Sequence, residues 1–116
     1  MYVGKTLFAQ VMEFVPWTSF TRIVPRYRGN AGVRTLSCAE QFRAMAFAQL
    51  TFRESLRDIE TCLNSHQEKL YHIGFRGSVS RSTLADANER RDWRIFQDFG
   101  QILIRMAQRL YQDEPF

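Results

Sequence analysis

The sequence predicts an all-α protein, and three observations support this fold class. Apolar residues repeat at spacings of three and four along most of the chain, as on one face of an amphipathic helix. Period-two alternation and runs of β-branched residues, which indicate strands, are scarce. Two Ser/Thr-x-x-Glu sequences, at residues 37–40 and 51–54, have the form of the capping box that opens a helix. We therefore expect a single domain, residues 1–116, built as a compact bundle of five or six short helices with a helix-turn-helix-like core.

The N-terminal third predicts two short helices and a basic loop. An apolar stripe that begins at Leu7 is terminated by Pro16, since proline cannot continue a helix. A second helix or turn within residues 17–27 is limited by Pro25. Residues 26–34 then form a loop in which glycine and asparagine supply the turn geometry.

The two capping boxes predict a helical hairpin, because they begin fourteen residues apart. The first box opens a helix whose apolar face holds Phe42, Met45, Ala46 and Leu50. The second box opens the helix that holds Leu56, Ile59 and Leu63 and ends at Asn64-Ser65.

The C-terminal half predicts two further helices. Residues 68–73 are expected to form one turn before Gly74 and Gly77 open a loop. A short helix follows from about Arg81 to Arg90, and a longer one from about Asp92 to Gln112. In the longer helix we expect Gly100 to allow a close helix crossing rather than a break. The aromatic side chains expected in the core are Trp93, Phe96 and Phe99.

Residues 53–90 are predicted to form a helix, a connection and a second helix, in the order found in a helix-turn-helix DNA-binding motif. In that motif the second helix places its N-terminal turn in the major groove. We expect Ser80 to cap that helix, and its free amides to attract phosphate. The side chains predicted to reach base edges are Arg81, Ser82, Thr83 and Asn88.

The other side chains of this helix follow from the same spacing. Leu84 and Ala87 are expected to face the core, and Asp86 can pair with Arg90 one turn later. The alternative interpretation is a short capped surface helix with intrahelical ion pairs.

Charge favours a polyanionic partner, because the net charge is +4 and the isoelectric point is about 9.5. Arginine, which forms bidentate contacts with phosphate and guanine, supplies most of the positive charge. A GC-rich genome would also enrich arginine without any functional cause. The positions of the arginines are therefore better evidence for a polyanionic partner than their number. The residues predicted to contact phosphates are Arg26, Arg28, Arg34, Arg90, Arg91 and Arg94.

No catalytic or metal constellation is indicated. Cys62 and His66, with His72 and Cys38, lack the paired spacing of a structural zinc site, and Cys62 is expected to pack in the core. No phosphate-binding loop and no nucleophile with a base partner is present. The apolar runs are too short to span a bilayer, and two unpaired cysteines suit a reduced cytoplasm. We therefore expect no cofactor, no membrane partner and no enzymatic activity from this chain.

Several runs of the sequence resemble a known family: Gly4–Gln10, Pro16–Phe20, Cys38–Thr51, Arg53–Glu60, Leu70–Phe75 and Val79–Asn88. In these runs the chain resembles the N-terminal domain that precedes the DDE catalytic domain in bacterial insertion-sequence transposases of the insertion sequence four group. The family's Ser-Arg-Ser-Thr-Leu-Ala-Asp-Ala run corresponds to Ser80–Ala87.

The resemblance implies a bacterial DNA-binding domain that recognises the terminal inverted repeats of a mobile element. Its implied partners are double-stranded DNA, the catalytic domain, expected beyond residue 116, and a second transposase subunit. That absent catalytic domain would use a divalent metal such as Mg²⁺, and no catalytic residue is carried over to this chain. The alternative function is a protein-interaction module for dimerisation or for packing on the catalytic domain.

Overall fold

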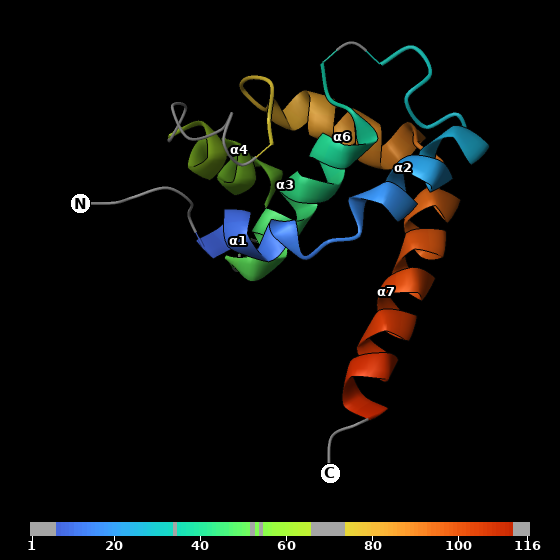
Figure 1. Ribbon diagram of the computed structural model, residues 1–116. Helices are drawn as coiled ribbons and strands as arrows, with labels where there is room; N and C mark the ends of the chain where they lie inside the picture. The colour runs from blue at the N-terminus through green and yellow to red at the C-terminus, as the bar shows by residue number, and fades with distance from the viewer. Residues whose placement is uncertain (1–6, 34, 52, 54, 66–73, 113–116) are drawn as a thin grey trace.

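The computed structural model describes residues 7–33, 35–51, 53, 55–65 and 74–112. In these ranges the chain forms six α-helices and no strand, which confirms the predicted all-α class (Figure 1). The helices are α1 (Leu7–Glu13), α2 (Trp17–Arg26), α3 (Cys38–Leu50), α4 (Leu56–Asn64), α6 (Arg81–Arg90) and α7 (Arg94–Gln112). Arg34, both histidines and the predicted turn at residues 68–73 lie outside the described residues.

The start of α3 confirms the first capping box. The Ser37 hydroxyl accepts from the Glu40 amide at 3.1 Å, and the Glu40 carboxylate accepts from the Ser37 amide at 2.9 Å. The amide of Cys38 donates to the side-chain oxygen of Asn30 at 2.9 Å. Asn30 lies in the turn that follows α2 (residues 27–33, called the basic turn below), so this turn also helps to cap α3.

The second predicted box is wrong. Thr51 ends α3 instead of opening α4, because its hydroxyl donates to the Phe47 carbonyl and its φ of −109° and ψ of 8° do not suit an N-cap. α4 begins one turn later, where the Ser55 hydroxyl accepts from the Asp58 amide at 3.1 Å. The short link between α3 and α4 still makes the two helices a contacting hairpin.

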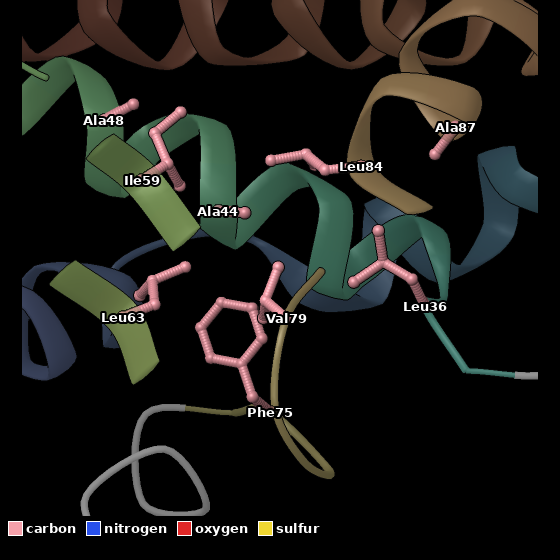
Figure 2. Close-up of a cluster of buried hydrophobic side chains, with 9 residues drawn as sticks. All are labelled: Leu36, Ala44, Ala48, Ile59, Leu63, Phe75, Val79, Leu84 and Ala87. Carbon is pink, nitrogen blue, oxygen red and sulfur yellow. The ribbon is translucent and has the colours of Figure 1, made fainter. Parts of the chain in front are cut away.

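α3, α4 and α6 enclose the first hydrophobic cluster, with α4 and α6 packed on each other and on α3. Figure 2 shows its nine side chains, Leu36, Ala44, Ala48, Ile59, Leu63, Phe75, Val79, Leu84 and Ala87. The side-chain amide of Asn64 donates to the Val79 carbonyl and accepts from the Val79 amide, which fixes the end of α4 to the approach to α6. α4 ends at Asn64 and α6 begins at Arg81, so more residues separate the two helices than the three or four of the usual helix-turn-helix turn.

α2 packs along the first half of α7 and builds the second, aromatic cluster. Phe20 lies at its centre, with ring centroids 4.9 Å from Phe99 and 5.8 Å from Phe42. Phe96 is only partly buried, and Trp93 is 66% exposed, so the prediction of a core Trp93 is wrong. Trp93 precedes the first residue of α7, where the chain turns at the surface.

α7 extends beyond the other helices, as Figure 1 shows at its C-terminal end. The radius of gyration is 15.1 Å, compared with about 13 Å for an average compact chain of this length. Gly100 does not break the helix, but the predicted close crossing is also wrong: a Cβ at Gly100 would meet nothing within 4 Å among the described residues. Leu50 of α3 is likewise exposed, whereas Ala44 and Ala48 form the buried side of that helix.

Candidate nucleic-acid interface

A cleft of about 970 Å³ lies where the basic turn meets the end of α6 and the start of α7. Five of the predicted DNA contacts line it, namely Arg28, Thr83, Arg90, Arg91 and Arg94. Asp86, Glu89 and Asp92 also line it, so four guanidinium groups share the cleft with three carboxylates. Folding therefore brings Arg28 beside the arginines of residues 90–94, more than 60 positions later in the sequence.

Arg28 is presented by a constrained turn. Its φ of 54° lies in the left-handed region, which costs a non-glycine residue roughly 1 kcal/mol or more. The next residue, Gly29, is buried, and a Cβ there would lie 2.6 Å from Ile95 and 2.7 Å from Cys38. The Arg28 side chain is exposed and lines the cleft, and no side-chain partner for it is found among the residues that the structure describes.

Arg90 and Arg94 each hold a carboxylate. Arg90 pairs with Asp86 at 2.9 Å, as its position one turn later predicted. Arg94 pairs with Asp92 at 2.7 Å, and this hydrogen-bonded pairing holds the pKa of Asp92 below its usual value. The Asp86–Arg90 pair is exposed on both sides, and such a pair contributes only about 0–1 kcal/mol. Arg94 instead holds Asp92 through two parallel guanidinium hydrogen bonds, so Arg90 is the arginine that can more easily exchange its carboxylate for another anion.

The Arg94 guanidinium also lies over the Tyr27 ring, 4.7 Å from its centroid. The Tyr27 hydroxyl donates to Asp98 at 2.5 Å, and this hydrogen bond raises the pKa of Tyr27. These contacts fix the wall of the cleft where α2 ends against α7.

Asn88 and Arg91 are used inside the domain. The Asn88 side-chain oxygen accepts from the buried Gln41 amide at 2.8 Å, and Arg91 donates to the Gln41 side chain at 3.0 Å and to the Leu36 carbonyl. Both side chains therefore contact Gln41 of α3 and hold the end of α6 against it. Asn88, which we expected to reach base edges together with the first turn of α6, lies near the other end of that helix.

The first turn of α6 presents Arg81 and Ser82 to solvent, whereas Thr83 is half-buried at the edge of the cleft. The expected cap is wrong: the Ser80 side chain makes no capping hydrogen bond. Instead the Arg81 amide donates to the Glu60 carboxylate of α4 at 2.8 Å. This carboxylate therefore occupies one of the first-turn amides that we expected to attract phosphate.

Arg26 lies outside the cleft. It lines a shallow groove between α2 and α7 with Arg105, and it is 4.0 Å from Asp98. Arg105 and Arg109 line the neighbouring hollow, and the sequence interpretation did not select either residue. Their signal was visible as two arginines one turn apart in a stretch without acidic residues.

No metal site is found among the described residues, where no group of three or more histidine, cysteine or acidic side chains could hold an ion. Cys38 is fully buried, and burial raises the pKa of its thiol. Cys62, expected in the core, is only partly buried. In the same described ranges, every helix is too short or too polar to cross a membrane.

The architecture defines an all-α domain with an arginine-lined cleft beside α6 and the start of α7. The chain belongs to the family described as "Domain of unknown function (DUF4372)", whose model matches residues 3–76. The match includes α1 to α4 and ends before α6. No curated protein and no solved structure gives a significant match to the chain.

Proposed function

We propose that this chain binds double-stranded DNA as the N-terminal domain of a bacterial insertion-sequence transposase, and that its target is the terminal inverted repeat of the element. The observation that carries this proposal is the cleft, where arginines of the basic turn, α6 and α7 come together. Membership of DUF4372, a family commonly seen in transposase-like proteins, supports the transposase context. In this proposal the protein acts in the bacterial cytoplasm, on nucleoid DNA.

Two parts of the surface have different roles in the proposal. The exposed turn of α6, with Arg81 and Ser82, reads base edges, and Leu84 and Ala87 anchor the helix from behind. Arg28 and Arg90 contact phosphates from the cleft, since Arg28 is exposed and the Asp86–Arg90 pair is weak.

In this proposal the DDE catalytic domain of the transposase, not this domain, carries out catalysis. We propose no catalytic role for any residue of this chain. DNA cleavage by the purified chain in the presence of Mg²⁺ would contradict this assignment.

Fluorescence anisotropy with labelled duplexes tests the function. The cognate duplex carries the inverted repeat that flanks the gene of this chain, and the control has the same composition in scrambled order. Preferential binding to the repeat at moderate salt is expected. Equal affinity for both duplexes would contradict end recognition, and no binding at low salt would contradict DNA binding altogether.

Replacing Arg81 with alanine is expected to weaken cognate binding by about 1–3 kcal/mol while leaving binding to the scrambled duplex almost unchanged. The reason is that a base contact contributes only where the correct base is present. Circular dichroism of the variant checks that the helix content is retained. An equal loss on both duplexes would show that Arg81 does not read bases.

Replacing Arg28 with alanine is expected to weaken binding to both duplexes to a similar degree. Loss of one phosphate contact should reduce the slope of log affinity against log salt by about 0.9. Arg57→Ala is the matched control, because Arg57 is an exposed arginine of α4 that does not line the cleft. An unchanged slope for Arg28→Ala, or the same change for Arg57→Ala, would exclude the cleft as the phosphate site.

A protein-interaction module is the second candidate function. The observation that favours it is the exposed apolar surface on the C-terminal half of α7. The two roles are compatible, because no residue from the C-terminal half of α7 lines the cleft.

A further inference from the structure

We propose that a row of arginines on α7 is a second surface for phosphates, and that the backbone of a bound duplex runs along it from the cleft. The row, which we call the arginine stripe, consists of Arg94, Arg105 and Arg109 of α7, with Arg26 of α2 beside them. The inference rests on the proposed DNA binding, but not on recognition of the inverted repeat, because contacts to phosphates carry no sequence information.

The three arginines of α7 lie on one face of the helix. At about 100° per residue, Arg105 lies about 20° from Arg94 around the helix axis, and Arg109 lies about 60° from it. Along the axis, at about 1.5 Å per residue, Arg109 is about 22 Å from Arg94. Arg94 also lines the cleft, so the stripe leads from the cleft toward the C-terminal end of α7, which extends beyond the other helices (Figure 1). Arg94 itself holds Asp92, so the new contacts are expected from the rest of the stripe.

Two shallow grooves between α2 and α7 connect the stripe to the cleft. Arg26, Asp98 and Arg105 line the first groove, and Arg105 and Arg109 line the second, so Arg105 belongs to both. The hydroxyl of Tyr27, which lines the cleft, donates to Asp98 at 2.5 Å, and this contact places the first groove directly beside the cleft. A long ligand in the cleft therefore meets the arginine stripe next.

The charge of this surface favours a polyanion. α2 contains two arginines and no acidic residue, and α7 contains three arginines and one acidic residue, Asp98. Asp98 already accepts from Tyr27, and it lies 4.0 Å from Arg26. Arg105 and Arg109 are exposed, and no ion pair of either is found within the part of the chain that the structure describes.

Continuity with the cleft indicates which polyanion this is. A duplex whose phosphates lie at Arg28 and Arg90 presents further phosphates at about 3.4 Å intervals along each strand. The 22 Å of the stripe, estimated at about 1.5 Å per residue, corresponds to about six base pairs of that duplex. The same DNA molecule can therefore neutralise both groups of arginines, whereas an acidic protein on the stripe would need a separate site beside the bound DNA.

The salt dependence of binding to a long duplex tests the stripe. Arg105→Gln is expected to reduce the slope of log affinity against log salt by about 0.9, because one phosphate contact is lost. Arg105→Lys keeps the charge and is expected to keep the slope. Arg57→Gln is the matched control, because it removes an exposed arginine of α4 that lines neither the cleft nor the two grooves. An Arg105→Gln slope equal to that of the wild type, or the same loss for Arg57→Gln, would overturn the proposal.

Duplex length tests the path along α7. For the wild type, the slope is expected to increase with duplex length until the DNA covers both the cleft and the stripe. In the double variant Arg105→Gln/Arg109→Gln, this plateau is expected at a duplex shorter by about six base pairs. Circular dichroism checks that the variants keep their helix content.

The outcomes separate this inference from the proposed function. An unchanged plateau length in the double variant would overturn the path along α7. DNA binding that depends on Arg28 but not on Arg105 would overturn the stripe alone and leave the proposed function intact. No binding of the wild type to any duplex would overturn both.

Discussion

Replacing Phe20 with alanine is expected to lower the free energy of unfolding by about 3–5 kcal/mol, the largest loss we expect from one substitution. Phe20 is 2% exposed and contacts the rings of Trp17, Phe42, Phe96 and Phe99. Truncation removes these contacts and leaves a cavity where α2, α3 and α7 meet. Domains are typically stable by about 5–15 kcal/mol, so a large part of the total stability is at risk.

Urea unfolding followed by circular dichroism measures this effect. Phe14→Ala is the matched control, because Phe14 is 83% exposed and lies between α1 and α2. We expect the control to change the free energy of unfolding by less than about 0.5 kcal/mol. Similar losses for the two variants would show that Phe20 is not the centre of the aromatic cluster.

Replacing Glu40 with glutamine is expected to cost about 2–4 kcal/mol at neutral pH. The Glu40 carboxylate is 4% exposed, closes the capping box of α3 and accepts from the Arg76 amide at 3.0 Å. It also forms an ion pair with the Arg76 guanidinium at 3.1 Å. Asp86→Asn, which removes an exposed carboxylate from a surface pair, is expected to cost less than about 1 kcal/mol.

The pH dependence of stability gives a second measurement on Glu40. Burial raises the pKa of this carboxyl, but the hydrogen bonds from Arg76 and Ser37 outweigh burial and hold the pKa below its ordinary value. A lowered folded pKa means that the carboxylate stabilises the fold fully above the unfolded pKa of about 4.3. This contribution is lost as the pH falls through the folded pKa.

The wild type is therefore expected to lose more stability than Glu40→Gln when the pH is lowered from about 6 to about 3. The difference in unfolding free energy between the two chains should shrink over this range. A constant difference would contradict the stabilised carboxylate, and the measurement needs only unfolding curves at a series of pH values.

Local sequence patterns predicted the parts of the fold that local interactions determine. The bounds of α6 and the capping box at Ser37 follow from neighbouring residues, and both are confirmed. Thr51 has the same pattern as Ser37, but its hydroxyl bonds backward to Phe47, and a four-residue pattern does not distinguish these two uses. The exposure of Trp93 could not be predicted from the spacing of apolar residues either, because it depends on where α7 starts relative to α3.

The candidate site was predictable in composition but not in arrangement. The arginines were selected by charge, and the pairing of Asp86 with Arg90 followed from helical spacing. The Glu60 carboxylate at the start of α6 comes from a helix 21 residues earlier, and the Gln41 side chain binds both Asn88 and Arg91 across the domain. Such long-range partners decide which polar side chains remain available, and spacing along one helix cannot reveal them.

Gly29 couples the hydrophobic interior to the position of Arg28 in the cleft. The side chains of Val24, Cys38 and Ile95 lie so close to Gly29 that they leave no room for a Cβ there. Arg28 is the residue directly before Gly29. A swelling or shift of those apolar side chains would therefore be passed directly to Arg28. If the cleft binds DNA as proposed, a genetic screen for loss of binding should recover substitutions at these interior positions as well as at the arginines.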